Sequence, residues 1–199
     1  MLEMKSNFSV VILSAGNSSR MGVPKLGLKY SEKTTFLENI LEKYLLYGCN
    51  EIVVVVNQQS EKYIKKNKVV FPENVKIVIN KNLELDRFYS VKIGLQSLEK
   101  KQATFIVNVD NPFVDREIIY ALLNEISNAD FVYPSYLGKG GHPVLLSQKI
   151  VNDIVNENKN HFNFKDYLQK YSKKIVEVNN EMVLVNINTL EEYNRYFTD

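Results

Sequence analysis

Hydrophobic positions along this chain alternate between short unbroken runs and helical spacing. Residues 8–13 and 51–56 are almost entirely apolar and rich in β-branched side chains, as strands are when a parallel sheet is covered on both faces. Between them, apolar residues recur every three or four positions over 34–47, which predicts a helix. Thr35 and Glu38 have the spacing of a capping box at the start of that helix.

The same alternation continues along the chain. Further strands are expected at 75–79, 104–109, 131–133, 143–146, 174–178 and 182–185. Further helices are expected at 60–66, 88–98, 115–126, 148–155 and 164–171, with a last helix after them. This order predicts a three-layer α/β/α sandwich with a mainly parallel, Rossmann-like sheet. Residues 1–199 are expected to form one domain, because that length supports one substantial core and no repeat or linker interrupts the pattern.

Composition narrows the classes of partner. The chain carries 25 basic and 23 acidic residues, well interspersed, so it lacks the massed basic face that nucleic-acid binding requires. The lysine-rich stretches 62–68 and 170–174 are interpreted as solvated faces. No stretch approaches the roughly 20 apolar residues of a membrane span, and the first apolar run does not resemble a signal peptide. We therefore expect a cytoplasmic protein with no nucleic-acid or membrane partner, and a buried thiol at Cys49.

The loop after the first strand carries the strongest chemical signal. Ligands of parallel α/β sheets bind beyond the carboxyl ends of the strands, where this loop lies. Gly16 and Gly22 allow a tight turn that brings backbone N–H groups close to an anion. Two hydroxyls and two cations add further donors: Ser18, Ser19, Arg20 and Lys25. The spacing matches neither a P-loop nor a dinucleotide fingerprint, but it suits a triphosphate better than a plain connection.

Two other segments are candidates for chemistry. Asp110 stands at the predicted carboxyl end of strand 104–109, where one carboxylate, phosphate oxygens and water could hold Mg²⁺. An aspartate before Asn111 and Pro112 also starts turns, so these residues alone leave both roles open. His142, between Gly141 and Pro143, is either a structural residue or a contact for substrate.

The loop sequence Leu13-Ser-Ala-Gly-x-Ser-x-Arg-Met-Gly-x-x-Lys25 resembles the signature of the nucleotidyltransferases that complete molybdenum cofactor. More broadly, it is similar to the superfamily that activates sugar and alcohol phosphates with nucleoside triphosphates. The resemblance implies a Mg²⁺-dependent enzyme, with Mn²⁺ as the alternative metal, that transfers a nucleoside monophosphate to a phosphorylated acceptor and releases pyrophosphate. It implies a catalytic set of Arg20, Lys25 and Asp110. The implied nucleotide-binding residues are Leu13, Ala15, Gly16, Ser18, Ser19, Arg20, Lys25, Asn80 and Ser90.

The resemblance also assigns the metal and acceptor sides. The segment around Asp110 is similar to the family's Asp-x-Pro, in which the aspartate holds the metal. The ending Val185-Asn-Ile-Asn-Thr resembles the family's last motif and implies Asn188 as a second metal ligand, with Asn186 as the runner-up. Asn188 could instead be the N-cap of the final helix. Gly140-Gly-His-Pro-Val144 resembles the cytidylyltransferase branch and places His142 on the acceptor side without a general-base role.

The residues leave alternatives open for the nucleotide base and for the acceptor. Ala15 and the Gly-His-Pro-Val segment favour CTP and a molybdopterin acceptor. Ser14 departs from the alanine of the CTP-using relatives, and the Asn-Ile-Asn-Thr ending resembles the guanylyl branch. Residues 85–89 and 160–165 depart from the family pattern, which leaves the acceptor open. The alternatives are a guanylyltransferase, a cytidylyl- or uridylyltransferase for a sugar or alcohol phosphate, and a non-enzymatic nucleotide-binding chaperone. Docking to a molybdoenzyme is part of the last alternative.

Overall fold

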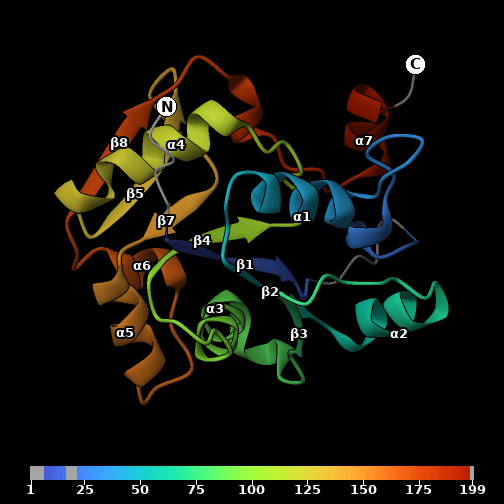
Figure 1. The fold of residues 1–199 in the computed structure, drawn as a ribbon, viewed down its shortest axis with the longest axis horizontal. Helices are drawn as coiled ribbons and strands as arrows, with labels where there is room; N and C mark the ends of the chain where they lie inside the picture. The colour runs from blue at the N-terminus through green and yellow to red at the C-terminus, as the bar shows by residue number, and fades with distance from the viewer. Residues whose placement is uncertain (1–6, 17–21, 198–199) are drawn as a thin grey trace.

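The described residues, 7–16 and 22–197 of a computed structural model, build an eight-stranded sheet with helices on both faces (Figure 1). The strand order is β3-β2-β1-β4-β7-β5-β6, and β8 pairs with β5. The strands are β1 (Phe8–Ser14), β2 (Glu51–Val56), β3 (Val75–Ile79), β4 (Ala103–Asn108), β5 (Phe131–Tyr136), β6 (Lys139–Gly140), β7 (Val144–Leu146) and β8 (Lys173–Glu177).

The sheet is mainly parallel, as the sequence predicts. Strands β1 to β4 run parallel to one another, and β7 is the antiparallel strand that joins β4 to β5. The register pairs Ser14 with Val56 and Leu13 with Asn108, so β1, β2 and β4 end side by side. Loops that leave these ends therefore meet at one edge of the sheet.

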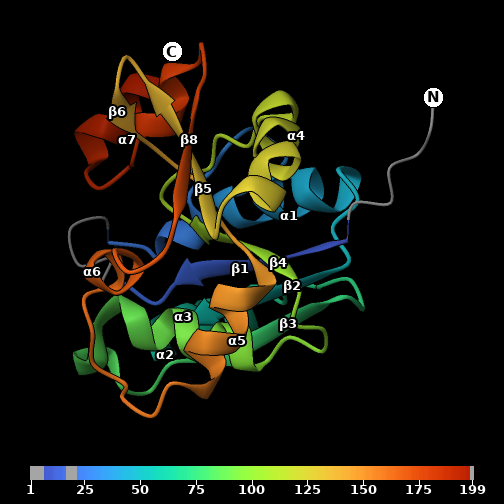
Figure 2. The same ribbon diagram turned by 90° about the vertical axis from the view of Figure 1, so that its left-hand side faces the viewer.

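Helices cover both faces. They are α1 (Phe36–Leu46), α2 (Gln58–Lys66), α3 (Asp86–Gln96), α4 (Arg116–Glu125), α5 (Gln148–Asn156), α6 (Phe164–Leu168) and α7 (Leu190–Phe197). Figure 2 shows α1 and α4 on one side of the sheet, and α3 and α5 on the other. Alternate side chains of β1 face these two layers: Val10 and Ile12 pack in the core under α1, and Val11 packs in the core under α3.

Local sequence signals explain where the helices begin. The capping box at α1 is present, with the Glu38 N–H donating to Thr35 Oγ1 at 3.3 Å and the Thr35 N–H donating to the Glu38 carboxylate at 2.7 Å.

Gly94 lets α3 approach the sheet, because a Cβ there would lie 2.5 Å from the side chain of Val11. Cys49 is buried as expected, and burial raises the pKa of its thiol to about 12.

One predicted strand is wrong. Residues 182–185 do not form a strand; the 3-10 helix η4 (Glu181–Leu184) occupies this stretch. Its carbonyls bond to distant groups, because the Asn111 amide donates to Met182 and Val185 and the His142 N–H donates to Val183. Long-range partners thus replace the neighbouring strand that an apolar run suggests. The helix predicted over 164–171 also ends early, at Leu168.

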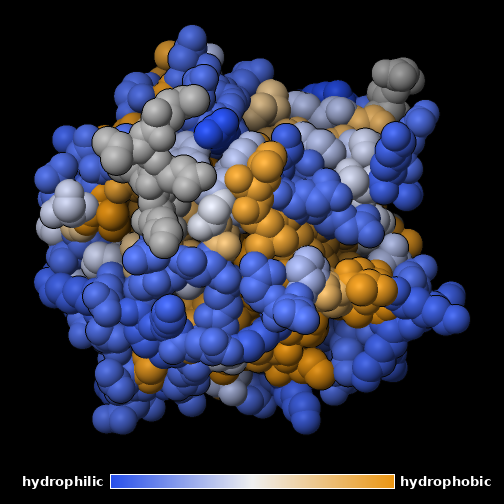
Figure 3. All heavy atoms as spheres, in the orientation of Figure 1, coloured by the Kyte–Doolittle hydropathy of each residue, from blue (hydrophilic) through white to orange (hydrophobic). Residues whose placement is uncertain are grey.

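The surface is mostly polar on the face that Figure 3 shows, where apolar side chains appear in narrow bands between hydrophilic ones. Across the described ranges, the helices are all too short or too polar to cross a bilayer.

Candidate active site

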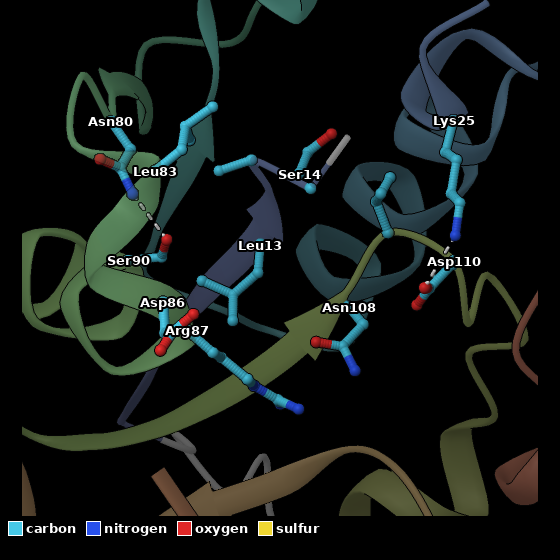
Figure 4. Close-up of a pocket in the computed structure, with 13 residues that line it drawn as sticks. Leu13, Ser14, Lys25, Asn80, Leu83, Asp86, Arg87, Ser90, Asn108 and Asp110 are labelled. Atoms are coloured by element: carbon cyan, nitrogen blue, oxygen red, sulfur yellow. Dashed lines mark hydrogen bonds and ion pairs between the residues drawn. The ribbon is translucent and has the colours of Figure 1, made fainter. Parts of the chain in front are cut away.

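A cavity of about 370 Å³ opens at the carboxyl ends of β1 and β4. Its walls come from the end of β1, the start of the following loop, the first turn of α3 and the loop after β4 (Figure 4). Six residues predicted to form the site line it: Leu13, Ala15, Gly16, Asn80, Ser90 and Asp110. Lys25 lines it as well, so segments from four parts of the chain converge where the topology predicts.

Lys25 joins the two predicted metal ligands. Its ammonium lies 3.1 Å from Asp110 Oδ2 and 2.7 Å from Asn188 Oδ1. The loops that carry Asp110 and Asn188 are tied together, because the N–H of Ile187 donates to the Asp110 carbonyl at 2.7 Å. The other carboxylate oxygen of Asp110 is buried and has no hydrogen-bond partner among the described residues. Two side-chain oxygens, Asp110 Oδ2 and Asn188 Oδ1, therefore contact the Lys25 ammonium, and Asp110 Oδ1 remains as a third acceptor.

Asn188 is not the cap of the final helix. Thr189 has that role: its hydroxyl accepts from the Glu192 N–H at 3.1 Å, and its N–H donates to the Glu192 carboxylate at 2.9 Å. The backbone N–H of Asn188 bonds to the same carboxylate, and this bond is the main reason that the pKa of Glu192 is lowered. The Asn188 side chain is thereby left to face Lys25. Asn186 contributes its carbonyl, which accepts from the Asn188 amide at 3.3 Å.

Asn80 and Ser90 form the opposite wall. The Asn80 amide donates to the Ser90 hydroxyl at 2.9 Å, and both side chains are buried. The Asn80 oxygen accepts the N–H of Asn82 at 2.8 Å, which fixes the orientation of the amide. Figure 4 shows this pair on one side of the cavity and the Lys25–Asp110 pair on the other.

Behind the loop that follows β1, the structure shows a residue that the sequence analysis missed. The buried Asn57, at the N-terminus of α2, donates to the carbonyls of Ala15 and Gly16 at 3.2 and 3.1 Å. The hydroxyl of Ser60 donates to the Ser14 carbonyl at 3.3 Å. These bonds hold the start of the loop through the carbonyls of residues 14–16. The predicted contacts Ser18, Ser19 and Arg20 lie outside the described residues.

Arg87 is the second residue that the sequence analysis missed. It lines the cavity from the first turn of α3, and its guanidinium lies 5.4 Å from the ring centre of Phe164 in α6. Arg87 is an exposed residue, yet enough protein surrounds its guanidinium to desolvate the charge. That desolvation lowers the pKa of Arg87, against the opposing effect of Asp110.

His142 lies in the wall of a second cavity, of about 750 Å³, which Arg87 also lines. The His142 backbone N–H donates to the Val183 carbonyl at 2.8 Å, while its Nδ1 is buried without a partner in the described part of the chain. Burial, followed by the charge of Arg87, lowers the pKa of His142 from its ordinary value. The imidazole is therefore neutral at neutral pH.

A match to a family model decides what kind of protein this geometry belongs to. Residues 10–174 match the model of the MobA-like NTP transferase domain. The chain belongs to the MobA-like NTP transferase family. The matched range includes Asp110, Arg87 and His142, and ends before Asn188.

Curated relatives of this MobA-like chain fall on both the guanylyl and the cytidylyl side. A probable molybdenum cofactor guanylyltransferase of Methanosarcina mazei is 26% identical over 96% of this chain and 90% of its own length. The 2-C-methyl-D-erythritol 4-phosphate cytidylyltransferase of Clostridioides difficile is 32% identical over 56% of this chain and 48% of its own length.

Solved structures share the fold of the MobA-like chain. Rv0371c from Mycobacterium tuberculosis H37Rv superposes with a TM-score of 0.79 at 17% identity, covering 97% of this chain and 99% of that one. The same protein has been described in complex with manganese, where it matches with a TM-score of 0.75 at 15% identity over 96% and 97% of the two chains.

The donors in the MobA-like site suit a hard divalent cation. Asp110 offers a carboxylate and Asn188 an amide oxygen, and the Lys25 ammonium already stands between them as a positive charge. Among the residues described here, no group of three or more His, Cys, Asp or Glu side chains forms a self-sufficient metal site. A metal here would therefore draw its remaining ligands from water and substrate phosphates, as Mg²⁺ does.

Proposed function

We propose that this protein transfers CMP from CTP to a phosphorylated acceptor, molybdopterin, and releases pyrophosphate. The single observation that carries the proposal is the convergence of Lys25, Asp110 and Asn188 at a cavity that Gly16 also lines. Positive charge, a metal-binding carboxylate and a loop of backbone donors are what a triphosphate requires.

In this proposal the base of the nucleotide lies near Asn80 and Ser90, and the triphosphate lies on the loop that starts at Gly16. Lys25 and Arg20 bind the phosphate oxygens and stabilise the charge that builds up in the transition state. A divalent metal held by Asp110 and Asn188 supplies further neutralisation of phosphate charge. Because Lys25 contacts both of these residues, its ammonium would have to leave them for the phosphates if a metal used the same oxygens.

The acceptor needs positioning more than activation. A phosphate monoester is already ionised at neutral pH, so its oxygen attacks the α-phosphorus without losing a proton. The new P–O bond forms as the bond to the bridging oxygen breaks, and pyrophosphate leaves with that electron pair. A neutral His142 fits this scheme, in which no general base is required.

GTP is the second candidate donor. The relative from Methanosarcina mazei, a probable guanylyltransferase, matches this chain along nearly its whole length, and this match favours GTP. Ala15 and the segment around His142 favour CTP, because the cytidylyl branch carries them. The two donors differ only in the base, so they predict the same roles for Lys25, Asp110 and Asn188.

The donor is tested by measuring the thermal stability of the protein with Mg²⁺ and each of CTP, GTP, UTP and ATP. A ligand at 100 times its Kd stabilises the folded state by about 2.7 kcal/mol. Stronger stabilisation by CTP than by the other nucleotides supports the proposal. Stronger stabilisation by GTP would instead make the protein a guanylyltransferase. Pyrophosphate release with molybdopterin then tests the reaction; nucleotide binding without release under any phosphorylated acceptor would favour the chaperone alternative.

A further inference from the structure

Arg87 stands where two cavities meet. It lines the nucleotide cavity and also the larger second cavity, which lies among β5, β6, β7 and α6. In Figure 4 its side chain extends along the edge of the nucleotide cavity, away from the Asn80–Ser90 pair and toward Asn108. A group bound to Arg87 would therefore be placed at the end of the cavity away from the predicted base site.

The guanidinium of Arg87 has no hydrogen bond or ion pair with any described residue. The guanidinium lies over the ring of Phe164, which holds the group without using its N–H donors. Asp110 acts on Arg87 electrostatically, but the ion pair of Asp110 is with Lys25. A cation kept in a concave position with its donors unused is a ready site for an anion, and the planar fork of arginine suits a phosphate.

The second cavity continues this positive character. Lys165 and Lys173 line it together with Arg87, and no Asp or Glu is among the described residues of its wall. The rest of the wall includes the aromatic side chains of Phe131, Tyr133, Phe164 and Tyr171. The cavity therefore suits an anionic molecule that has a substantial apolar or flat part.

We propose that Arg87 binds the phosphate of the acceptor and presents it to the α-phosphorus, while the second cavity holds the body of the acceptor. This inference rests on the proposed function. An in-line displacement needs the nucleophile on the side opposite to the leaving pyrophosphate. Pyrophosphate would leave from the Gly16–Lys25 side, and Arg87 stands across the cavity from it, where the second cavity begins.

The test uses three full-length variants: Arg87→Gln, Arg87→Lys and the matched control Arg116→Gln. Arg116 also opens a helix and lies 5.4 Å from a ring centre, that of Tyr120, but it lines neither of the two cavities. Each protein is first titrated with non-hydrolysable CTP and GTP analogues in Mg²⁺. It is then saturated with the tighter analogue and titrated with phenyl phosphate, an aromatic phosphate monoester. Circular dichroism checks that each variant is folded.

We expect Arg87→Gln to weaken phenyl phosphate binding by roughly 10- to 100-fold, the effect of losing charged hydrogen bonds, with nucleotide affinity nearly unchanged. Arg87→Lys should recover part of the loss, because it restores the charge but not the fork. Arg116→Gln should match the wild type in both titrations. With an active pair of substrates, the same Arg87 variants should raise the KM for the acceptor and leave the KM for the nucleotide nearly unchanged.

Equal binding of phenyl phosphate by the wild type and Arg87→Gln would overturn the inference. So would a loss of nucleotide affinity larger than the loss of phenyl phosphate affinity, because Arg87 would then belong to the donor site. If the wild type binds nucleotide but no phenyl phosphate, the inference fails while the proposed function stands. If the wild type binds phenyl phosphate in a way that depends on Arg87 but binds no nucleotide, the proposed function fails and Arg87 remains a phosphate site. Binding of neither ligand overturns both.

Discussion

The ammonium of Lys25 lies 2.7 Å from the side-chain oxygen of Asn188, although 163 positions of sequence separate the two residues. Lys25 follows the loop proposed to bind phosphate, and Asn188 belongs to the segment before α7, so this contact joins two motifs. It also places positive charge where a divalent cation would stand, between Asn188 and Asp110. Lysine and metal are thus expected to compete for the same oxygens when no nucleotide is bound.

Removing the Lys25 charge should suppress the reaction. We expect Lys25→Ala to lower the rate of pyrophosphate release by about 100- to 1,000-fold, the usual effect of losing one group that stabilises transition-state charge. Lys33→Ala, which removes an exposed lysine, should keep the wild-type rate. Near-normal turnover of Lys25→Ala would argue against the proposed role of the loop.

Asn188 and Asn186 can be distinguished through metal affinity. Asn188→Asp should tighten the binding of Mn²⁺ in the presence of nucleotide, because a carboxylate adds charge to the site, and Asn188→Ala should weaken it. Asn186→Ala should have little effect, since Asn186 contributes a backbone carbonyl to this network. Electron paramagnetic resonance of free Mn²⁺ measures each affinity. A larger effect at Asn186 would reverse the assignment.

The depressed pKa of His142 should make stability fall in mild acid. Burial, then Arg87, lower this pKa below 6.5, and Asp110 opposes the shift. The unfolded chain therefore binds more protons than the folded chain between 6.5 and the folded pKa. The stabilisation that the neutral His142 provides is complete above pH 6.5, and it is lost as the pH falls from 6.5 to the pKa of the folded state. Denaturant unfolding of His142→Gln should show a smaller loss there, and an unchanged pH dependence would contradict the prediction.

Gly94 should tolerate no side chain. A Cβ would come within 2.5 Å of Val11 and 2.9 Å of Val55, so Gly94→Ala must shift α3 away from the sheet. We expect a loss of about 1–3 kcal/mol in the free energy of unfolding. Gly16→Ala is the matched control, because a Cβ there meets no atom of the described residues within 4 Å. A stability of Gly94→Ala equal to that of the control would show that α3 sits more loosely on β1.

The parallel sheet could be predicted because its strands are buried on both faces. Strand β2 is an unbroken run of buried residues whose pattern differs from that of the neighbouring helices. The segment 182–185 has similar hydrophobicity, but its partners are Asn111 and His142, and contacts this distant leave no mark on a local pattern. The same reason explains why Asn57 and Arg87 were missed, since both act across gaps in sequence that only the fold closes.

The roles of the predicted site residues stay predictions, although their placement is informative. Asp110 could be located because it follows the end of a parallel strand. Asn80 and Ser90 could be located because their segment resembles the nucleotide-proximal loop and helix of the family. Sequence alone left Asn188 between a cap and a metal ligand. The adjacent Thr189 takes the cap through its own hydrogen bonds, which excludes that role for Asn188, and the metal-ligand role stays a prediction.

The bond from the Ile187 N–H to the Asp110 carbonyl has a consequence for the order in which the protein is made. The eight strands of the described residues are complete by residue 177, ahead of the segment that carries Ile187 and Asn188. The side chain of Asn188, which meets Lys25, is therefore translated after the whole sheet. In the order of synthesis, the residues that build the architecture precede the residue that would complete the proposed cation site beside Asp110.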